Sequence, residues 1–92
     1  MPYKYLLISP MSLGIQPIDD TFPIILQLKE APFVDWYISI NKYDGKKLEC
    51  EVVRVPQSTT DKQVAKAQKK LYKHILAIIK EFIEEETEQS ID

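Results

Sequence analysis

The sequence is poor in the residues from which many binding sites and covalent links are built. Among its 92 residues are one cysteine, one histidine, one arginine and two glycines. The lone Cys50 excludes an intramolecular disulfide and a cysteine-built zinc site, and the lone His74 excludes a pair of histidine ligands. The two isolated glycines, Gly14 and Gly45, exclude a glycine-rich loop whose backbone amides could wrap a phosphate.

The sequence also has little excess charge of either sign, because it contains 12 basic and 14 acidic residues and its net charge is −2. Nucleic-acid-binding proteins usually carry a cationic excess and rely on arginine, so the composition argues against a nucleic-acid partner. No apolar run approaches the roughly 20 residues of a membrane span. The first apolar run, which ends at Ser9-Pro10, is too short for a signal peptide. We therefore expect a cytoplasmic protein outside the membrane.

The distribution of residue types divides the chain in two. Residues 1–57 hold all six prolines and most aromatic and β-branched residues, whereas residues 60–92 lack proline and glycine. This segregation predicts a single α+β domain: an antiparallel, meander-like, four-stranded sheet covered on one face by one long C-terminal helix, in two layers. The expected strands are 3–8, 22–28, 33–42 and 46–55, followed by a helix at 60–86 and an acidic tail at 87–92.

Alternation along the third expected strand predicts a sheet with one apolar and one solvent-exposed face. The apolar positions are Val34, Trp36, Ile38 and Ile40. For the hairpin that follows, a two-residue loop would place Ile40 and Ile38 opposite glutamates. A three-residue loop, Tyr43-Asp44-Gly45, places them opposite Leu48 and Cys50 instead. We therefore expect a type I turn with a glycine bulge.

The helix carries a capping-box pattern and two apolar strips. Thr60 and Gln63 have the spacing with which a hydroxyl and an amide satisfy the first backbone N–H groups. At 100° per residue, one strip is suited to cover the sheet; it contains Val64, Leu71, Ile75, Ile78 and Phe82. Beside it lies a second apolar strip, which contains Tyr72, Leu76, Ile79 and Ile83. We expect this second apolar strip to be the interface of a homodimer.

The order of charges along the helix favours the same interpretation. Five lysines lie between Lys62 and Lys73, and glutamates follow from Glu81 onward. This order opposes the helix dipole, which prefers acids first and bases last. An antiparallel copy of the helix would place the basic half of one chain against the acidic half of the other. The alternatives are a fully covered core helix and a different protein partner.

Two further surfaces are candidate binding sites. A lysine row on the helix lies opposite the core face and could hold an anion; it consists of Lys62, Lys66, Lys69 and Lys73. The long connection Ser9–Thr21 carries apolar side chains that could dock a partner protein or a small ligand; they are Met11, Leu13, Ile15 and Ile18. The same side chains could instead lie under the edge of the sheet.

The sequence gives little indication of catalytic activity. His74 lies on the flank of the helix, Cys50 faces inward, and Asp19-Asp20 lacks the repeated spacing of a cation-binding loop. We expect no metal, no cofactor and no enzymatic activity. The leading interpretation is a homodimeric protein-interaction or accessory protein of the inhibitor or adaptor type. The alternative is a dimer that holds a small anionic ligand or nucleotide between its protomers.

Overall fold

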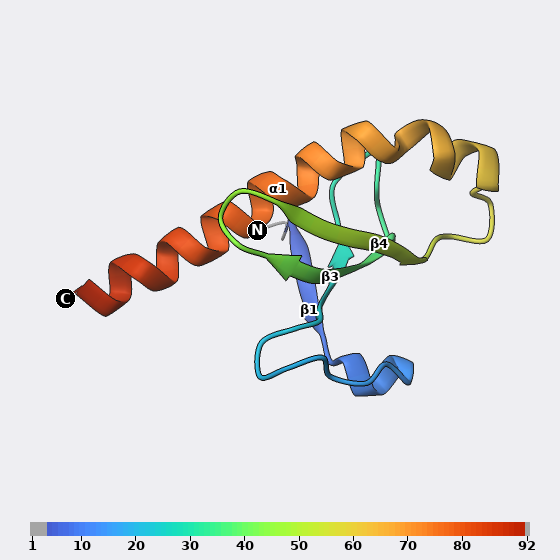
Figure 1. The fold of residues 1–92 in the computed structure, drawn as a ribbon. Coiled ribbons are helices and arrows are strands. Elements are labelled where there is room, and N and C mark those ends of the chain that lie inside the picture. The colour runs from blue at the N-terminus through green and yellow to red at the C-terminus, as the bar shows by residue number, and fades with distance from the viewer. Residues whose placement is uncertain (1–3, 92) are drawn as a thin grey trace. The chain divides into compact units, whose positions relative to one another are not determined.

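The structure, a computed structural model, describes residues 4–91, and of residues 83–91 the helical backbone alone. Four strands form one antiparallel sheet in the order β1-β2-β3-β4, and a helix follows them (Figure 1). The elements are β1 (Tyr5–Ile8), β2 (Ile24–Leu28), β3 (Tyr37–Tyr43), β4 (Leu48–Arg54) and α1 (Asp61–Ile91). The predicted α+β class and the predicted strand order are confirmed. Contacts divide the chain into two units, Met1–Thr59 and Thr60–Asp92.

One face of the sheet is apolar across its strands. Leu26 lies opposite Ile38, and Ile38 lies opposite Val52 on its other side. Leu26 is 2% exposed and Ile38 is completely buried. Side chains directly opposite each other on neighbouring antiparallel strands share a face and contact each other. The predicted apolar face is therefore confirmed from Ile38 to Ile40, and the predicted cover of this face by the helix stays a prediction.

The opposite face is less exposed than the alternation predicts. Ile25 of β2 lies directly opposite Ser39 of β3, and the two residues are 1% and 2% exposed. The expectation of a face open to solvent along its whole length is therefore wrong at this point. Ile15 and Ile18, from the connection after β1, line a hollow on this face together with Ser39. Part of the connection thus lies over the middle of the sheet.

The third strand begins at Tyr37 rather than at the predicted position 33. Phe33 N–H donates to the carbonyl oxygen of Glu30 at 2.9 Å, and Trp36 N–H donates to that of Phe33 at 3.0 Å. Asp35 has a φ of 66°, which turns the backbone away from extended geometry. Phe33 and Trp36 are buried with their rings edge to face at 5.0 Å, whereas Val34 is 46% exposed. Alternation cannot identify such a turn, because two buried aromatics three residues apart do not follow the two-residue period of a strand.

The β3–β4 hairpin has the predicted faces but a different register. Ile40 lies opposite Cys50 and Ile38 opposite Val52, so each isoleucine pairs two residues later in the chain than predicted. The predicted three-residue turn is therefore wrong. The loop is longer because the carboxylate of Asp44 accepts the N–H groups of Lys46 at 2.9 Å and Lys47 at 2.7 Å.

Two irregularities restore the apolar pairing. Next to the loop, Tyr43 lies opposite Leu48 and Lys42 lies opposite Glu49. If this register continued along the strands, Ile40 would lie opposite Glu51. The register shifts between Ile40 and Lys42, so Asn41 has no paired residue on β4. Such a β-bulge changes which side chains share a face. A second shift follows between Tyr37 and Ile38 and leaves Val53 unpaired on β4.

The start of α1 follows the capping-box prediction. Gln63 N–H donates to Thr60 Oγ1 at 3.2 Å, and Thr60 N–H donates to Gln63 Oε1 at 2.8 Å. Of the first apolar strip, Leu71, Ile75 and Ile78 are buried. The helical backbone continues to Ile91 and includes most of the residues expected as an acidic tail. No residue after Thr60 breaks the helix, because the sequence contains no later proline or glycine.

The other strands are shorter than predicted at their ends. The first and second begin at Tyr5 and Ile24. A turn precedes the second strand, because the N–H groups of Ile18 and Asp19 donate to the carbonyl oxygen of Phe22 at 2.8 and 3.1 Å. The fourth strand is Leu48–Arg54. It begins later than predicted because Lys46 and Lys47 belong to the loop around Asp44.

Candidate functional site

The second apolar strip of α1 is divided by burial. Tyr72 is 37% exposed, Leu76 is half-buried and Ile79 is 1% exposed. Ile83 lies outside the residues whose side chains the structure describes. Tyr72 and Leu76 follow each other at a spacing of four, so they lie on one side of the helix. The part of the strip that could contact another molecule therefore contains Tyr72 and Leu76.

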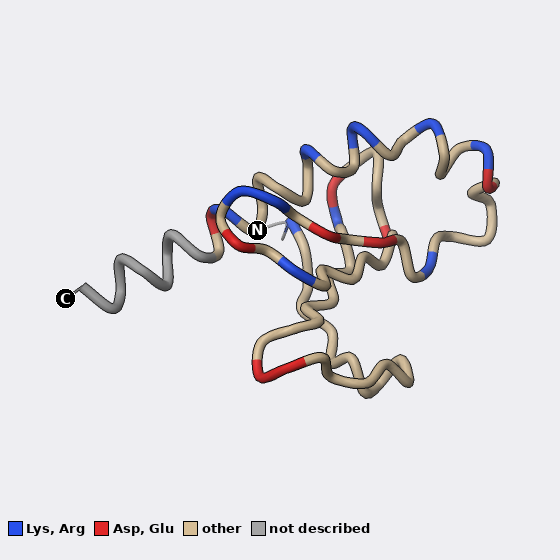
Figure 2. Tube along the Cα trace, in the orientation of Figure 1, with Lys and Arg blue, Asp and Glu red and all other residues tan. Residues whose placement is uncertain are grey.

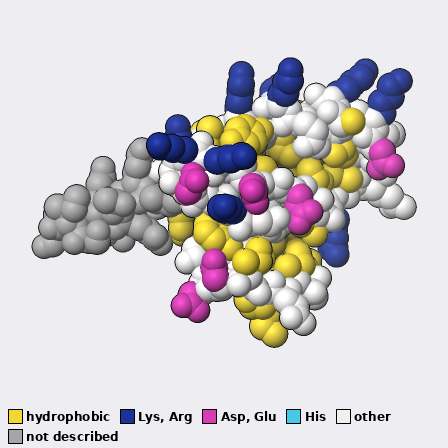
Figure 3. Space-filling view, in the orientation of Figure 1, with side chains coloured by type: hydrophobic (Ala, Val, Ile, Leu, Met, Phe, Trp, Pro, Cys, Tyr) yellow, Lys and Arg dark blue, Asp and Glu magenta, His cyan; other side chains and the backbone are white. Residues whose placement is uncertain are grey.

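The lysine row is exposed along its length. Figure 2 shows the basic positions in the first half of α1, and Figure 3 shows lysine side chains projecting from this part of the helix. All four predicted members are exposed: Lys62, Lys66, Lys69 and Lys73. Their ammonium groups repel one another at spacings of three and four residues. The row is therefore a surface of concentrated positive charge on one helix.

The connection between β1 and β2 is folded. A short 3-10 helix, η1 (Pro10–Leu13), ends at Gly14, whose left-handed backbone (φ 71°) favours glycine. Of the predicted docking residues, Met11 is 76% exposed and Ile18 is 60% exposed. Leu13 and Ile15 are half-buried. The connection thus combines the two predicted alternatives, with some apolar side chains in solvent and others against the protein.

A hydrogen-bonded turn fixes the end of this connection. The carboxylate of Asp19 accepts the N–H groups of Thr21 at 2.7 Å and Phe22 at 2.8 Å. These two donors, Phe22 above all, hold the pKa of the Asp19 carboxyl below its ordinary value. The turn places Ile18 before it and the buried Pro23 after it on the same hollow.

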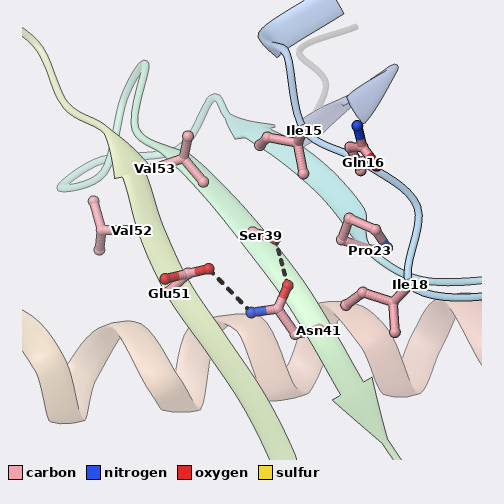
Figure 4. Close-up of a pocket in the computed structure, with 9 residues that line it drawn as sticks. All are labelled: Ile15, Gln16, Ile18, Pro23, Ser39, Asn41, Glu51, Val52 and Val53. Atoms are coloured by element: carbon pink, nitrogen blue, oxygen red, sulfur yellow. Dashed lines mark hydrogen bonds between the residues drawn. The ribbon is translucent and has the colours of Figure 1, made fainter. Parts of the chain in front are cut away.

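This hollow, which we call the sheet hollow, has a volume of about 410 Å³. It lies between the connection and strands β3 and β4 (Figure 4). Its walls are Ile15, Gln16, Ile18, Pro23, Ser39, Asn41, Glu51, Val52 and Val53. Glu51 is the one charged residue among these nine. The sheet hollow therefore combines apolar side chains from the connection and from β4 with a polar group formed by Ser39, Asn41 and Glu51 on the strands.

A chain of hydrogen bonds crosses the polar wall of the sheet hollow. Ser39 Oγ donates to Asn41 Oδ1 at 2.7 Å, and Asn41 Nδ2 donates to Glu51 Oε1 at 3.1 Å (Figure 4). An ionised carboxylate can only accept, so Glu51 fixes the direction of both bonds. The chain of donors therefore ends at Glu51, whose other carboxylate oxygen is still available to a donor.

Cys50 and His74, the two candidate nucleophile or base residues, lie apart in the sequence and in different units of the chain. Cys50 is half-buried on β4, and this burial raises the pKa of its thiol. A thiol that is less ionised is a weaker nucleophile. His74 is half-buried on α1. The inward orientation predicted for Cys50 is consistent with its partial burial.

The described residues contain neither a metal-binding cluster nor a helix that could span a membrane. In this part of the chain no three histidine, cysteine, aspartate or glutamate residues lie close enough together to hold a metal ion. Asp19 and Asp20 form the carboxylate pair that was considered above as a cation site. The Oδ1 atom of Asp19 already accepts two backbone N–H groups. Over the same residues, α1 is too polar to cross a membrane.

Comparison with known proteins adds no relative. No protein-family model, curated protein or solved structure matches the chain. Interpretation of the site therefore depends on the geometry of the residues themselves.

Sequence patterns identified some walls of the sheet hollow and missed others. Ile15 and Ile18 were candidates because they are apolar residues in a long connection. Ser39 and Asn41 were placed on one face by alternation alone. Glu51 was not expected to hydrogen bond to Asn41, since that contact depends on the bulge at Asn41. Neither composition nor alternation signals a bulge at an asparagine.

Proposed function

We propose that the chain is a non-enzymatic protein-interaction protein that acts as a homodimer through α1. The observation that carries this proposal is the exposure of Tyr72, an aromatic residue next to the half-buried Leu76 on one side of the helix. Tyrosine is enriched at protein interfaces, where its ring supplies apolar area and its hydroxyl a hydrogen bond. A second copy would cover both side chains.

Charge complementarity favours a second copy over an unrelated partner. Basic residues fill the first half of α1, from Lys62 to Lys73, and acidic residues follow from Glu81 onward. In an antiparallel pair related by a two-fold axis, each basic half faces the partner's acidic half. Within one chain the same order places like charges four residues apart, which costs about 0.2–0.5 kcal/mol per pair. Pairing of two helices would offset this repulsion.

Substitution of Leu76 tests the interface. Leu76→Glu introduces a charge into the proposed contact, and we expect a folded monomer, judged by sedimentation and by the helical circular dichroism signal. Ala77→Glu is the matched control, because Ala77 is exposed on the same turn and lies about 100° farther round the helix. This control should stay dimeric. Equal dimerisation of both variants would overturn the proposal. Ile79 is unsuitable because it is 1% exposed and a charge there would unfold the protein.

The lysine row supports a second candidate function, the binding of an anionic ligand between protomers. Its four members are exposed and share one side of the helix. A bound ligand stabilises the folded state by mass action, so ADP should raise the melting temperature in this case. Charge reversal at Lys66 and Lys69 should abolish the increase. The protein-interaction proposal predicts no increase with ADP.

Residence in the cytoplasm belongs to the same proposal. Cys50 is the one cysteine of the sequence, so no intramolecular disulfide can form. A small domain that uses no disulfide suits a reducing compartment. An inhibitor or adaptor of another cytoplasmic protein would fit this location.

A further inference from the structure

The sheet hollow has the two properties that a cationic side chain requires. Its apolar lining can cover methylene groups, and Glu51 of β4 supplies a carboxylate (Figure 4). We propose that this hollow binds the side chain of a lysine or arginine from a partner protein, with Glu51 accepting a hydrogen bond from its charged end. All nine lining residues belong to the unit Met1–Thr59, whereas the residues of the proposed interface belong to the other unit.

The direction of the hydrogen bonds and the charge of Glu51 favour a cationic occupant over an anionic one. Ser39 and Asn41 each direct a donor along the polar wall toward Glu51. The Ser39 hydroxyl and one N–H of the Asn41 amide are thus engaged within the protein, and the charge at the end of the chain is negative. Glu51 would repel a carboxylate or phosphate. An ammonium or guanidinium group would instead donate a hydrogen bond to the Glu51 carboxylate. Ser39, the first donor in this series of hydrogen bonds, is 2% exposed, so its position is fixed by the packing around it.

The apolar wall fits the stem of the same occupant. Ile18 is 60% exposed and Val53 is 37% exposed, and both line the hollow. Lysine and arginine place their aliphatic stems along apolar surface and keep the charged end near polar groups. The volume of about 410 Å³ is large enough to admit one such side chain.

Neighbouring charges favour a cation as well. Asp19 and Asp20 directly follow the lining residue Ile18 in the chain, and Arg54 directly follows the lining residue Val53. On β4 the exposed Glu49 is two residues before Glu51, but Lys42 lies opposite Glu49 and offsets its charge. Within two residues of the lining in the sequence there are four carboxylates, Asp19, Asp20, Glu49 and Glu51, and two cations, Lys42 and Arg54. Surface charge of one sign raises the local concentration of the opposite ion.

Nuclear magnetic resonance titration of the full-length protein tests the proposal. The ligand is the capped peptide acetyl-Gly-Lys-Gly-amide, and the matched control peptide carries norleucine, which has the same carbon stem without the ammonium group. We expect saturating amide shifts at Ile18, Ser39 and Glu51. The norleucine peptide should bind at least about threefold more weakly, as expected for the loss of one charged hydrogen bond. Equal binding of the two peptides would overturn the proposal.

Two variants separate Glu51 from general electrostatic attraction. Glu51→Gln keeps the size of the side chain and an acceptor for Asn41 but removes the charge, so the preference for lysine over norleucine should disappear. Glu49→Gln removes a nearby charge outside the hollow and should keep the preference. Equal losses in both variants would contradict a specific site. Shifts with butylammonium but none with the lysine peptide would contradict an occupant from a partner protein.

Discussion

Thr60 and Gln63 exchange hydrogen bonds at the start of α1, each accepting the other's backbone N–H. Loss of an N-cap hydroxyl usually costs about 1 kcal/mol of stability. We therefore expect Thr60→Ala to lower the free energy of unfolding by about 0.5–2 kcal/mol, measured by urea denaturation. For a domain of this size, a loss of 1 kcal/mol corresponds to a decrease of roughly 4–8 °C in melting temperature.

Thr60→Ser is the control for this prediction, because serine keeps the hydroxyl that accepts from Gln63 N–H. The serine variant should remain within about 0.5 kcal/mol of the parent protein. An alanine variant as stable as the serine variant would show that the cap contributes nothing.

Phe33 and Val34 are neighbours with opposite environments, and their substitution tests the turn before β3. Phe33 is 2% exposed and contacts the ring of Trp36, whereas Val34 is 46% exposed. Phe33→Ala should cost about 3–5 kcal/mol, and Val34→Ala should cost less than about 0.5 kcal/mol. If Phe33→Ala does not fold, Phe33→Leu supplies a milder loss for the same urea measurement. A larger cost at Val34 than at Phe33 would favour the strand predicted from position 33.

Three aspartates make the protein sensitive to acid. Backbone N–H donors, that of Lys47 first and then Lys46, lower the pKa of the Asp44 carboxyl below its ordinary value of 3.8. Donors at Phe22 and Thr21 lower the pKa of Asp19, and hydrogen bonding to the Lys29 ammonium lowers that of Asp35. Each group binds a proton more readily when the chain is unfolded. Its contribution to stability is therefore present above pH 3.8 and is lost as the pH falls through the folded pKa.

Urea denaturation across pH measures this loss. We expect the free energy of unfolding to decrease progressively as the pH falls from about 5 to about 2. Asp44→Asn should be less stable than the parent protein at neutral pH, and the difference should shrink on acidification. A difference that stays constant with pH would show that the ionised Asp44 does not stabilise the loop.

The partial burial of Cys50 predicts slow thiol chemistry. Burial raises the pKa of this thiol above its ordinary value of 9.0, so the folded protein contains less thiolate at neutral pH. Ellman's reagent at about pH 8 should react with the folded protein more slowly than with the protein unfolded in urea. Equal rates would show that the fold does not shield Cys50.

Features that depend on local spacing could be predicted from the sequence. The cap at Thr60 and Gln63 requires two residue types at a fixed spacing, and the buried strip through Leu71 and Ile75 follows from the helical period. The apolar face containing Ile38 follows from the period of a strand. Each pattern repeats over neighbouring residues, so one misplaced residue does not obscure it.

Features that depend on a single irregular residue could not be predicted. The side chain of Asp44 accepts two N–H groups and lengthens the hairpin loop, and the bulge at Asn41 then restores the apolar pairing. Since either change alone would invert the face, only their combination is compatible with a buried Ile40. The hydrogen bond from Asn41 to Glu51, and with it the polar wall of the sheet hollow, depends on the same bulge.

The molar mass of the protein in solution tests the proposed homodimer most directly. Light scattering over a range of protein concentrations should give a mass near twice the 10.7 kDa of one chain. The mass should fall toward that of one chain on dilution, since the proposed contact is reversible. A mass of 10.7 kDa at every concentration would contradict the homodimer.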